Sequence, residues 1–438
     1  MHYFLLTLER VIYIIEKEVA QLKLTEFTND RYRLLQYLKK NEMMYNDSII
    51  IKLSQDEMAN SLGVSKHKVN TLVKELIALK VLGIYDLKGK YIITQLGNKV
   101  LDAIEGRDNK AKASQFKCAS FFAGVGGIDL GFEQVGFQTI YANEIDVKAV
   151  HTYELNFGLK VDNRDIHDVV MDLEEGKDIF NGEDIDILLA GFPCQAFSVA
   201  GYREGFDDKK GRGGLFFEIM KIVRAKKPPV VFLENVKNLV GHDNGKTFKI
   251  IREALESEGY YIKYKVLNSM DYGNVPQNRE RIYIVAFLDE NQWESFEFPK
   301  QIPLENKLRS VIDFHSKVEE KFYYTEERFK HFETLRETVT SQQTVYQWRR
   351  VYVRENKNNV CPTLTANMGT GGHNVPLVLT DYGIRKLTPK ECFSLQGFPN
   401  TYKLPNDIAM SYLYKQAGNS VSVSVIKRIA EEILKVIG

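Results

Sequence analysis

The sequence has few cysteines, and none of them forms a close pair. No C-x-x-C motif occurs anywhere in the 438-residue chain. This spacing excludes a disulfide framework and a structural zinc site, and we expect no bound metal. It also indicates a reducing compartment, so we expect a cytoplasmic protein. The four cysteines are Cys118, Cys194, Cys361 and Cys392.

Long apolar runs and an excess of charge are absent too. No apolar segment approaches the roughly 20 residues that a membrane helix requires. The N-terminus, MHYFLLTLER, lacks the basic start and small-residue cleavage site of a signal peptide. The net charge is +1, so composition alone does not predict a nucleic-acid-binding protein, and any basic face must be local. The length predicts two or three domains.

The N-terminal part has the pattern of a helix-turn-helix. The segment FLLTLERVIYIIEKEVAQL has apolar residues at helical spacing. Further on, Ser54 and Glu57 have the spacing of a capping box, Gly63 ends that helix, and Ser65 can cap the next. Strand-like segments LGIYDL and KYIITQ follow, joined by Lys-Gly-Lys.

This order of elements resembles a winged helix-turn-helix, an α+β module that we assign to residues 1–107. Lys66 and Lys68 lie at the start of the second helix, where such folds contact the major groove. We therefore expect this module to bind DNA. The alternative is a small helical module for packing or dimerisation. A polar segment at 108–115 is the predicted linker.

From residue 116, short apolar segments alternate with helical patterns. The apolar segments are KCASFFAG, QTIYANEID, IDILLAGFP, PPVVFLENV and RIYIVAFL. Alternation of this kind predicts an α/β fold with a mostly parallel sheet covered on both faces. Ligand sites in such folds lie beyond the carboxyl ends of the strands.

The ends of the first predicted strands indicate a nucleoside cofactor. Gly124, Gly126 and Gly127 allow a tight turn and a close approach to a ligand, but the G-K-[ST] ending of a phosphate loop is absent. Glu144 ends the second strand, where an acid can accept both ribose hydroxyls. Asp165 would end a third strand, near an adenine amino group. S-adenosylmethionine suits this set better than NAD or ATP, although packing glycines with two capping acids would give the same pattern.

Cys194 follows the fourth predicted strand on the same side of the sheet. A buried structural cysteine is the ordinary interpretation. However, Glu234 ends the next strand, and Arg279 and Arg281 follow in QNRERI. These groups suit one reaction, in which the thiolate attacks C6 of a cytosine, the carboxylate supports N3 and N4, and C5 takes a methyl group.

These motifs together resemble the bacterial cytosine-5 DNA methyltransferase family. Residues 116–438 contain, in that family's order, FAGVGG, ANEID, RDI, GFPCQAFS, ENV, QNRERI, RKLTPKECFSLQGFP and QAGNSVSV. The resemblance implies that Cys194 is the nucleophile, that Glu234 binds the cytosine edge, and that Arg279 and Arg281 lie beside the base. Two positions depart from the family's usual residues: Ser120 replaces an acid and Arg164 replaces glycine.

The resemblance also implies the cofactor site and a Rossmann-like fold. Asn419 and Ser420, near the C-terminus, would complete the pocket for S-adenosylmethionine, and the helix VSVIKRIAEEILKVI would pack back on the first domain. The predicted cofactor-binding residues are Phe122, Gly124, Gly126, Gly127, Glu144, Ile145, Asp165, Ile166, Leu215, Asn419 and Ser420.

A long stretch between QNRERI and RKLTPK resembles the family's small target-recognition domain. It alternates basic and aromatic residues, which suits contacts to bases and phosphates, although a solvated surface loop is the alternative. The resemblance suggests that Gln347 fills the hole left by a flipped cytosine. The predicted DNA-binding residues are Gln195, Ser198, Gln347, Arg349, Arg350, Arg354, Thr363, Leu364, Lys66 and Lys68.

We therefore predict a DNA (cytosine-5)-methyltransferase that flips its target base out of the duplex. The catalytic and cofactor-binding domain would span 116–299, the target-recognition domain 300–383, and a C-terminal part completing the catalytic domain 384–438. Double-stranded DNA is the expected partner, and a restriction endonuclease a possible functional companion. The alternatives are an RNA cytosine-5 methyltransferase, a DNA-binding regulator with a weak or inactive methyltransferase domain, and a non-nucleic-acid enzyme of the same fold.

Overall fold

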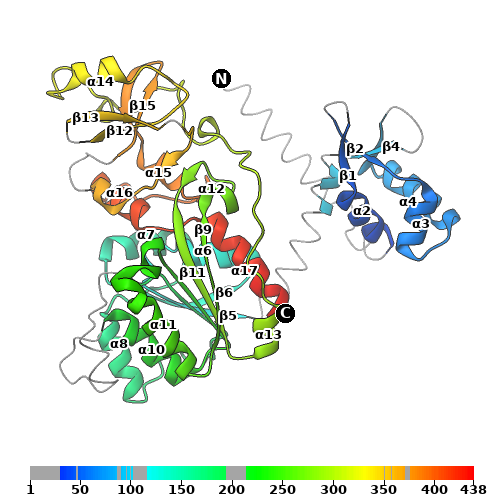
Figure 1. The fold of residues 1–438 in the computed structure, drawn as a ribbon, viewed down its shortest axis with the longest axis horizontal. Coiled ribbons are helices and arrows are strands. Elements are labelled where there is room, and N and C mark those ends of the chain that lie inside the picture. The colour runs from blue at the N-terminus through cyan, green and yellow to red at the C-terminus, as the bar shows by residue number, and fades with distance from the viewer. Residues whose placement is uncertain are drawn as a thin grey trace. The chain divides into compact units, whose positions relative to one another are not determined.

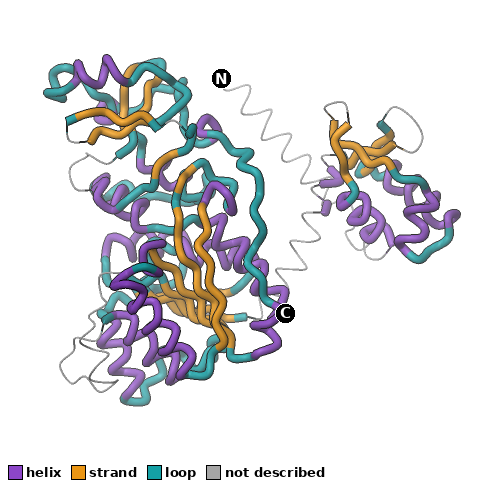
Figure 2. The backbone as a smooth tube through the Cα atoms, viewed as in Figure 1, coloured by secondary structure: helices purple, strands orange, loops and turns teal. Residues whose placement is uncertain are grey.

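The chain divides into two compact units, Met1–Ala111 and Lys112–Gly438, which we describe separately. The structure is a computed structural model, shown in Figures 1 and 2. The predicted helix before residue 30 and the predicted linker at 108–115 lie outside the described residues. The structure describes residues 30–45, 48–85, 90–94, 96–98, 100–101, 116–193, 214–349, 351–356, 358–369 and 375–438.

The N-terminal unit contains a helix pair followed by a strand ribbon. Ser54 begins the first helix of the pair: its hydroxyl accepts from the Glu57 N–H (3.2 Å), and the Glu57 carboxylate accepts from the Ser54 N–H (2.7 Å). Gly63 ends that helix in the left-handed conformation, with φ +67°. The elements are α2 (Asp30–Lys40), β1 (Glu42–Tyr45), β2 (Ser48–Lys52), α3 (Gln55–Leu62), α4 (Lys66–Ala78), β3 (Leu82–Ile84) and β4 (Lys90–Ile93).

The predicted helix, turn, helix and two strands are thus present as α3, α4, β3 and β4. One face of α4 is buried through Val69, Leu72, Val73 and Leu76, against α2 and the sheet. The hairpin β1–β2 was not predicted, and it extends the ribbon to a four-stranded sheet of order β1-β2-β4-β3.

The second unit is built on a six-stranded sheet of order β6-β5-β7-β8-β11-β9. The first four strands in this order are parallel, as predicted. In contrast, β11 pairs antiparallel with both β8 and β9, so the sheet is mixed. The strands are β5 (Lys117–Phe121), β6 (Gln138–Asn143), β7 (Ile187–Ala190), β8 (Val230–Val236), β9 (Tyr261–Asn268) and β11 (Glu280–Phe287).

Helices cover both faces of this sheet, as Figure 1 shows. One core is formed with α8 (Ile166–Glu174), α10 (Leu215–Lys226) and α11 (Lys246–Ser257), and the opposite core with α6 (Gly127–Val135) and α17 (Val423–Ile437). Neighbouring residues of β5 and β7 alternate between the two cores, because successive strand side chains point to opposite faces. The predicted packing of the C-terminal helix on this domain is confirmed.

A second sheet, of order β13-β12-β15-β16, lies in the predicted target-recognition region. Its small core joins the sheet to α14 through Leu335, Tyr346, Trp348 and Leu377. The expected boundary at 383/384 falls inside β16. The remaining elements are β12 (Tyr346–Arg349), β13 (Tyr352–Glu355), β15 (Leu377–Thr380), β16 (Gly383–Lys386), α7 (Val147–Phe157), α12 (Ser269–Tyr272), β10 (Gln277–Asn278), α13 (Glu290–Ser295), α14 (Phe332–Thr338), β14 (Cys361–Pro362), α15 (Pro389–Ser394) and α16 (Met410–Asn419).

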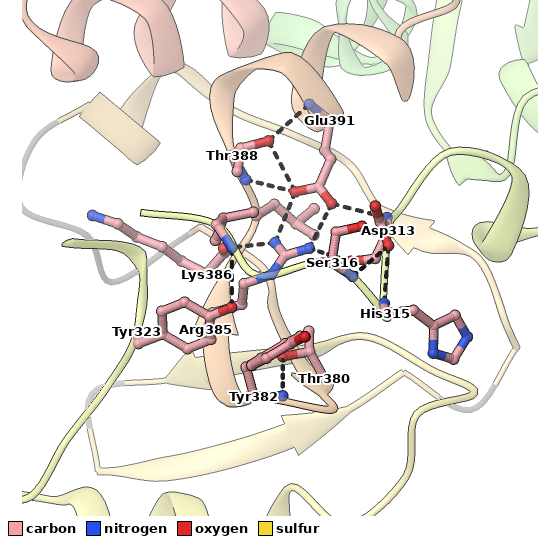
Figure 3. A network of polar contacts seen from close by, with 12 residues as sticks. Asp313, His315, Ser316, Tyr323, Thr380, Tyr382, Arg385, Lys386, Thr388 and Glu391 are labelled. Atoms are coloured by element: carbon pink, nitrogen blue, oxygen red, sulfur yellow. Dashed lines mark hydrogen bonds and ion pairs between the residues drawn. The ribbon is translucent and has the colours of Figure 1, made fainter. Parts of the chain in front are cut away.

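A buried ion pair joins β16 to α15 where the chain returns from the recognition sheet. The Arg385 guanidinium donates to both Glu391 carboxylate oxygens (2.7 and 2.8 Å) and to the Asp313 carbonyl (2.7 Å), as Figure 3 shows. The Thr388 N–H donates to the Glu391 carboxylate, and the Thr388 hydroxyl accepts from the Glu391 N–H, which completes a capping box. These bonds fix the sheet β13-β12-β15-β16, which we call the recognition sheet after its predicted role, to the start of α15.

No described helix has the length and apolar character that crossing a membrane requires.

Candidate cofactor and catalytic site

The predicted site residues gather where the parallel strands β5, β6, β7 and β8 end. The glycine turn follows β5, Glu144 follows β6, Gly191 follows β7, and Glu234 lies near the end of β8. The carboxyl ends of adjacent parallel strands share one edge of a sheet, so these four segments form one site.

The glycine turn combines a left-handed backbone with tight packing. Phe122, Gly124 and Gly126 all have positive φ, at +54°, +57° and +74°. A Cβ at Gly126 would lie 2.2 Å from the Phe157 ring, and one at Gly127 would lie 2.6 Å from the Ser420 hydroxyl oxygen. At Gly124 a Cβ would meet nothing closer than 4.0 Å. Gly126 and Gly127 are therefore required by packing, whereas Gly124 leaves its side of the turn open to a ligand.

Glu144 holds the turn and keeps room for a ligand. One carboxylate oxygen accepts from the Gly124 N–H and the other from the Asp146 N–H, both at 2.8 Å. Burial raises the pKa of Glu144, and the two backbone bonds oppose that change. Each oxygen retains a lone pair after one bond, so the carboxylate can still accept from two hydroxyls.

The C-terminal segment packs behind Gly127 through Ser420. Ser420 lies just after α16 and is buried, and its hydroxyl oxygen has no hydrogen-bond partner among the described residues. A buried hydroxyl without a partner is costly, which suits a site that a polar ligand completes. Asn419, the last residue of α16, is exposed.

The other predicted cofactor residues differ in exposure. Ile145 is 59 % exposed, directly after Glu144, whereas Ile166 is buried. Leu215 begins α10 and is partly buried against the core. The placement of Asp165 at the end of a third strand was wrong: Asp165 is the N-cap of α8, where its carboxylate accepts from the His167 N–H (3.0 Å).

The departure at Arg164 has a structural explanation. Its guanidinium pairs with Asp162 (2.8 Å) and with Asp172 on α8 (2.5 Å). The side chain is therefore committed to the outside of the loop that leads to Asp165, and it takes no space from Glu144 or the glycine turn.

Glu234 is a buried carboxylate with one oxygen left for a ligand. The Arg281 Nε atom lies 3.2 Å from Oε1 of Glu234, but that oxygen has no aligned hydrogen bond among the described residues. Burial raises the pKa of Glu234, and the charges of Arg281 and Arg279 oppose the rise. A Cβ at Gly191 would lie 3.7 Å from Oε2 of Glu234, so the segment that leads to Cys194 passes beside this carboxylate.

Arg279, predicted to lie beside the base, is held by backbone carbonyls, and its charge acts on the nearby Glu234. It is buried, and its guanidinium donates to the backbone carbonyls of Leu364 (2.8 Å), Gly418 (3.2 Å) and Ser420. Burial lowers the pKa of Arg279 to about 9, with the neighbouring Arg281 charge acting in the same direction. Arg279 lies just before β11, and these bonds join the start of that strand to Leu364 and to the segment that contains Ser420.

Sequence reasoning missed two buried amides that position this site. The Asn235 side chain donates to the Phe192 carbonyl (2.8 Å), two residues before Cys194. Gln277 accepts from the Leu364 N–H (3.1 Å) and donates to the Leu395 carbonyl (2.6 Å). The motifs ENV and QNRERI contained both residues, but only their charged members were singled out.

The three described cysteines are unsuited to nucleophilic attack on a base. Cys118, Cys361 and Cys392 are free and buried, and burial raises the pKa of each thiol. The thiolate is the reactive form, so these three thiols are inert at neutral pH. Cys194 is the one other cysteine in the sequence, and it lies with Gln195, Ser198 and Arg350 outside the described residues.

The predicted DNA contacts in the recognition sheet differ in exposure. Arg349 and Arg354 are exposed, at the end of β12 and on β13. Gln347 is 8 % exposed and lies opposite Arg354 in the β12–β13 pairing. Thr363 donates to the Asn278 carbonyl (2.6 Å), and Leu364 is buried beside Gln277. This dipeptide therefore ties the recognition region to β10, which lies outside the six-stranded sheet.

The predicted DNA contacts of the N-terminal unit lie on the surface of α4. Lys66 pairs with Asp56 (2.7 Å) and Lys68 with Asp30 (3.4 Å). All four side chains are at least one-third exposed. Exposed pairs of this kind contribute little free energy, so both lysines could exchange these partners for phosphates.

Comparison with known proteins identifies the larger unit. Residues 116–435 match the family described as C-5 cytosine-specific DNA methylase. The chain is 59 % identical over 318 residues to the type II methyltransferase M.Bsp6I of Bacillus sp. (strain RFL6), covering 72 % of this chain and 98 % of the relative. It is 38 % identical over 341 residues to M.HhaI of Haemophilus parahaemolyticus, covering 75 % of this chain and 97 % of that one.

Another relative extends beyond this unit. The type II methyltransferase M1.ScrFI of Lactococcus lactis subsp. cremoris is 34 % identical over 405 residues, which cover 90 % of this chain and 95 % of the relative. An alignment of that extent must continue well into the residues before 116. Among solved structures, DNMT2 of Spodoptera frugiperda shares the fold, with a TM-score of 0.55 at 21 % identity over 73 % of this chain and 99 % of that one.

Proposed function

The chain belongs to the family of C-5 cytosine-specific DNA methylases, and from that premise we propose how its residues perform the reaction. It is a DNA (cytosine-5)-methyltransferase of the restriction–modification type. We propose that the substrate is a cytosine flipped out of a short specific duplex sequence. Stacked in the duplex, C5 and C6 of the ring would be inaccessible to side chains at the end of the sheet.

The observation that carries this proposal is the buried Glu234 beside the segment of Cys194. Among the described residues its Oε1 atom lacks a hydrogen bond, and Arg281 lies beside it. A cytosine edge offers the ring nitrogen N3 and the N4 amino group. Both can hydrogen-bond to a carboxyl group whose pKa is raised. A proton between Glu234 and the base would lie toward N3, and the second carboxyl oxygen would accept from N4.

The proposed covalent step makes the cytosine a nucleophile. The Cys194 thiolate adds to C6, and the electron pair of the C5–C6 bond moves to C5 while N3 is held by Glu234. When bound, S-adenosylmethionine supplies the electrophilic methyl group that C5 takes. The C5 proton then leaves to a base, the double bond re-forms, and the thiolate is released from C6.

The residues around the glycine turn fit S-adenosylmethionine. Gly124 leaves space at the turn, the Glu144 carboxylate suits two ribose hydroxyls, and Ile145 offers an exposed apolar surface. The Ser420 hydroxyl, unpaired within the described part of the chain, lies behind Gly127. No lysine follows the turn, which agrees with a cofactor that carries no phosphate.

Two regions would contact DNA with different tasks. In the catalytic unit, Gln195 and Ser198 would close over the duplex, and Arg349, Arg350 and Arg354 would hold its phosphates or read its bases. We assign Gln347 to the space left by the flipped base.

The N-terminal unit would bind a separate site. Its supports are the capped helix pair and the exposed Lys66 and Lys68 at the start of α4. We propose that this unit binds an operator near its own gene and limits expression. Such control would keep methylation in step with a companion restriction endonuclease.

A trapping experiment tests the catalytic proposal. Duplex DNA carrying 5-fluorocytosine at the target, incubated with S-adenosylmethionine, should become covalently attached to the wild type, because after methyl transfer the fluorine at C5 cannot leave as a cation. The variant Cys194→Ser should form no adduct, since its hydroxyl is a far weaker nucleophile at neutral pH, and should still bind S-adenosylmethionine. A matched control is Cys361→Ser, which should keep the adduct. Activity retained by Cys194→Ser, with no trapping by the wild type, would refute the mechanism.

A further inference from the structure

Behind the glycine turn lies a buried carboxylate that the reaction does not use. Asp129, in the first turn of α6, is 0 % exposed. The Ser120 hydroxyl donates to one of its oxygens (3.0 Å) and the Tyr153 hydroxyl to the other (2.9 Å). These residues come from β5, α6 and α7, so one carboxylate joins the three elements that surround the turn.

Tyr153 transmits this anchor to the backbone of the turn. Its ring stacks on Phe157, with ring centroids 4.3 Å apart. Both rings press on Gly126: a Cβ there would lie 2.2 Å from Phe157 and 2.9 Å from Tyr153. The position of the Tyr153 ring therefore sets how far the turn can bend away from the ligand.

Two other bonds hold the same turn from different sides. The Tyr402 hydroxyl donates to the Val125 carbonyl (2.6 Å), and Glu144 accepts from the Gly124 N–H. The Asp129 bonds supply the third point, behind Gly126. A turn held at three points is pre-organised, and pre-organisation raises affinity by reducing the cost of ordering on binding.

We propose that the Asp129 carboxylate, held between the Ser120 and Tyr153 hydroxyls, is a positioning residue for S-adenosylmethionine. This inference rests on the proposed cofactor. An ionised carboxylate accepts from both hydroxyls, whereas a protonated one must use an oxygen as a donor. The Tyr153 hydroxyl would then lose its acceptor or rotate away from it. The contact of the Tyr153 ring with Gly126 would weaken as a result.

The arrangement makes cofactor affinity sensitive to pH. Burial raises the pKa of Asp129 to about 6, although the bonds from Tyr153 and Ser120 oppose the rise. Affinity should therefore be full above that pH and fall as pH drops through it. Burial also raises the pKa of Glu133, on the same helix, to about 7. The titratable groups that interact with Asp129 are Cys118 on β5, Glu133 on α6, Tyr153 on α7 and Tyr402.

The Ser120–Asp129 contact permits an exchange test. Both side chains are buried, and their oxygens are 3.0 Å apart. In the double variant Ser120→Asp/Asp129→Ser, a single carboxylate would occupy nearly the same place from the opposite element. If Asp129 acted only through the packing of α6, this exchange would not restore cofactor affinity.

The experiment is calorimetric titration of the full chain with S-adenosylmethionine, at about pH 8 and about pH 5.5. At the higher pH, Asp129→Asn should bind about tenfold more weakly, because its amide cannot accept from both hydroxyls. The exchange variant should recover most of that loss. At the lower pH, the ratio of wild-type affinity to Asp129→Asn affinity should fall. Any titration of the ligand itself affects both proteins equally and cancels in this ratio. Glu133→Gln should behave as the wild type does.

Different outcomes separate the inference from the function on which it rests. Wild type that binds no S-adenosylmethionine would overturn the proposed cofactor. Wild type and Asp129→Asn that bind equally at both pH values would overturn the positioning role alone. If Asp129→Asn does not fold, as judged by near-ultraviolet circular dichroism, the exchange variant decides. A folded exchange variant that binds as wild type does supports the role, and one that fails to bind overturns it.

Discussion

At the scale of single residues, the Arg385–Glu391 pair shows how buried charge fixes the recognition sheet. Arg385 is fully buried and donates through two nitrogens to the carboxylate of Glu391 (Figure 3). Removing one partner of such a pair leaves a charge that is neither solvated nor neutralised. The cost of the loss should therefore greatly exceed that of any surface pair.

We expect Arg385→Met to lower the free energy of unfolding of the larger unit by about 3–5 kcal/mol, because Glu391 would remain buried and unpaired. Denaturant titration, followed through the transition of that unit, measures the change. The double variant Arg385→Met/Glu391→Met should recover much of the loss. The control Arg336→Met breaks an exposed pair with Glu333 and should cost less than about 1 kcal/mol. Equal losses at the two sites would contradict the argument.

The positions of single site residues were predictable where a motif places a reactive group at the end of a strand. Glu234 and the glycine turn lie where the sequence placed them, because the ends of parallel strands converge whatever the rest of the chain does. Asn235, Gln277 and Asp129 were not predicted as site residues. Their roles depend on carbonyls and hydroxyls that are distant in the chain, such as the Tyr153 hydroxyl. No local sequence pattern predicts such partners.

At the scale of elements, the start of α6 is the most constrained point of the site. Gly126 has positive φ and lies against the ring of Phe157. Gly158, at the end of α7, has a similar φ of +66°, but a Cβ there would meet no described atom within 4 Å. The two glycines therefore differ in packing rather than in backbone conformation.

Gly126→Ala should weaken S-adenosylmethionine binding more than about tenfold, because the methyl group would displace the turn or the Phe157 ring. Gly158→Ala should cost only about 1–2 kcal/mol of stability, from the left-handed conformation, and should leave cofactor affinity unchanged. Calorimetric titration and thermal unfolding of both variants measure these effects. Unaltered affinity in Gly126→Ala would show that the turn adapts to the side chain.

The elements were largely predictable, but the direction of the later strands was not. β5, β6, β7 and β8 follow apolar segments that alternate with helical patterns, which is the signature of parallel pairing. β11 has an equally apolar sequence, yet it runs antiparallel to β9 because only the short α12 and β10 separate the two strands, too little chain for a crossover. β9 was missed because it is the edge strand, and most of its side chains are at least partly exposed.

At the scale of the whole molecule, the described residues of the two units form separate cores. The core of the N-terminal unit uses residues from α2, α3, α4 and its own sheet. The family match begins only at residue 116. The division after residue 111 falls inside the predicted linker at 108–115, which composition alone suggested.

We expect a fragment of residues 1–107 to shift DNA from upstream of its own gene in a gel. Lys66→Ala/Lys68→Ala should abolish the shift, and each lost phosphate contact should flatten the salt dependence by about one unit of slope. Lys39→Ala, at the end of α2, is the matched control and should bind as the wild type does. If the fragment binds no DNA and its removal changes only solubility or dimerisation, the regulatory role is wrong.

The packing of α17 against α6 has a consequence for how the enzyme is made. Strand β5 leaves the ribosome long before α17, yet the buried face of α17 fills the same core as Cys118 of β5 and Phe132 of α6. Until α17 is synthesised, that side of the sheet must stay open, and contacts between distant segments form slowly. The described core of the N-terminal unit, in contrast, is drawn from residues 34–101 and is complete early in synthesis. If the N-terminal unit binds the operator proposed for it, a newly made chain should be competent to bind that operator before it is competent to methylate.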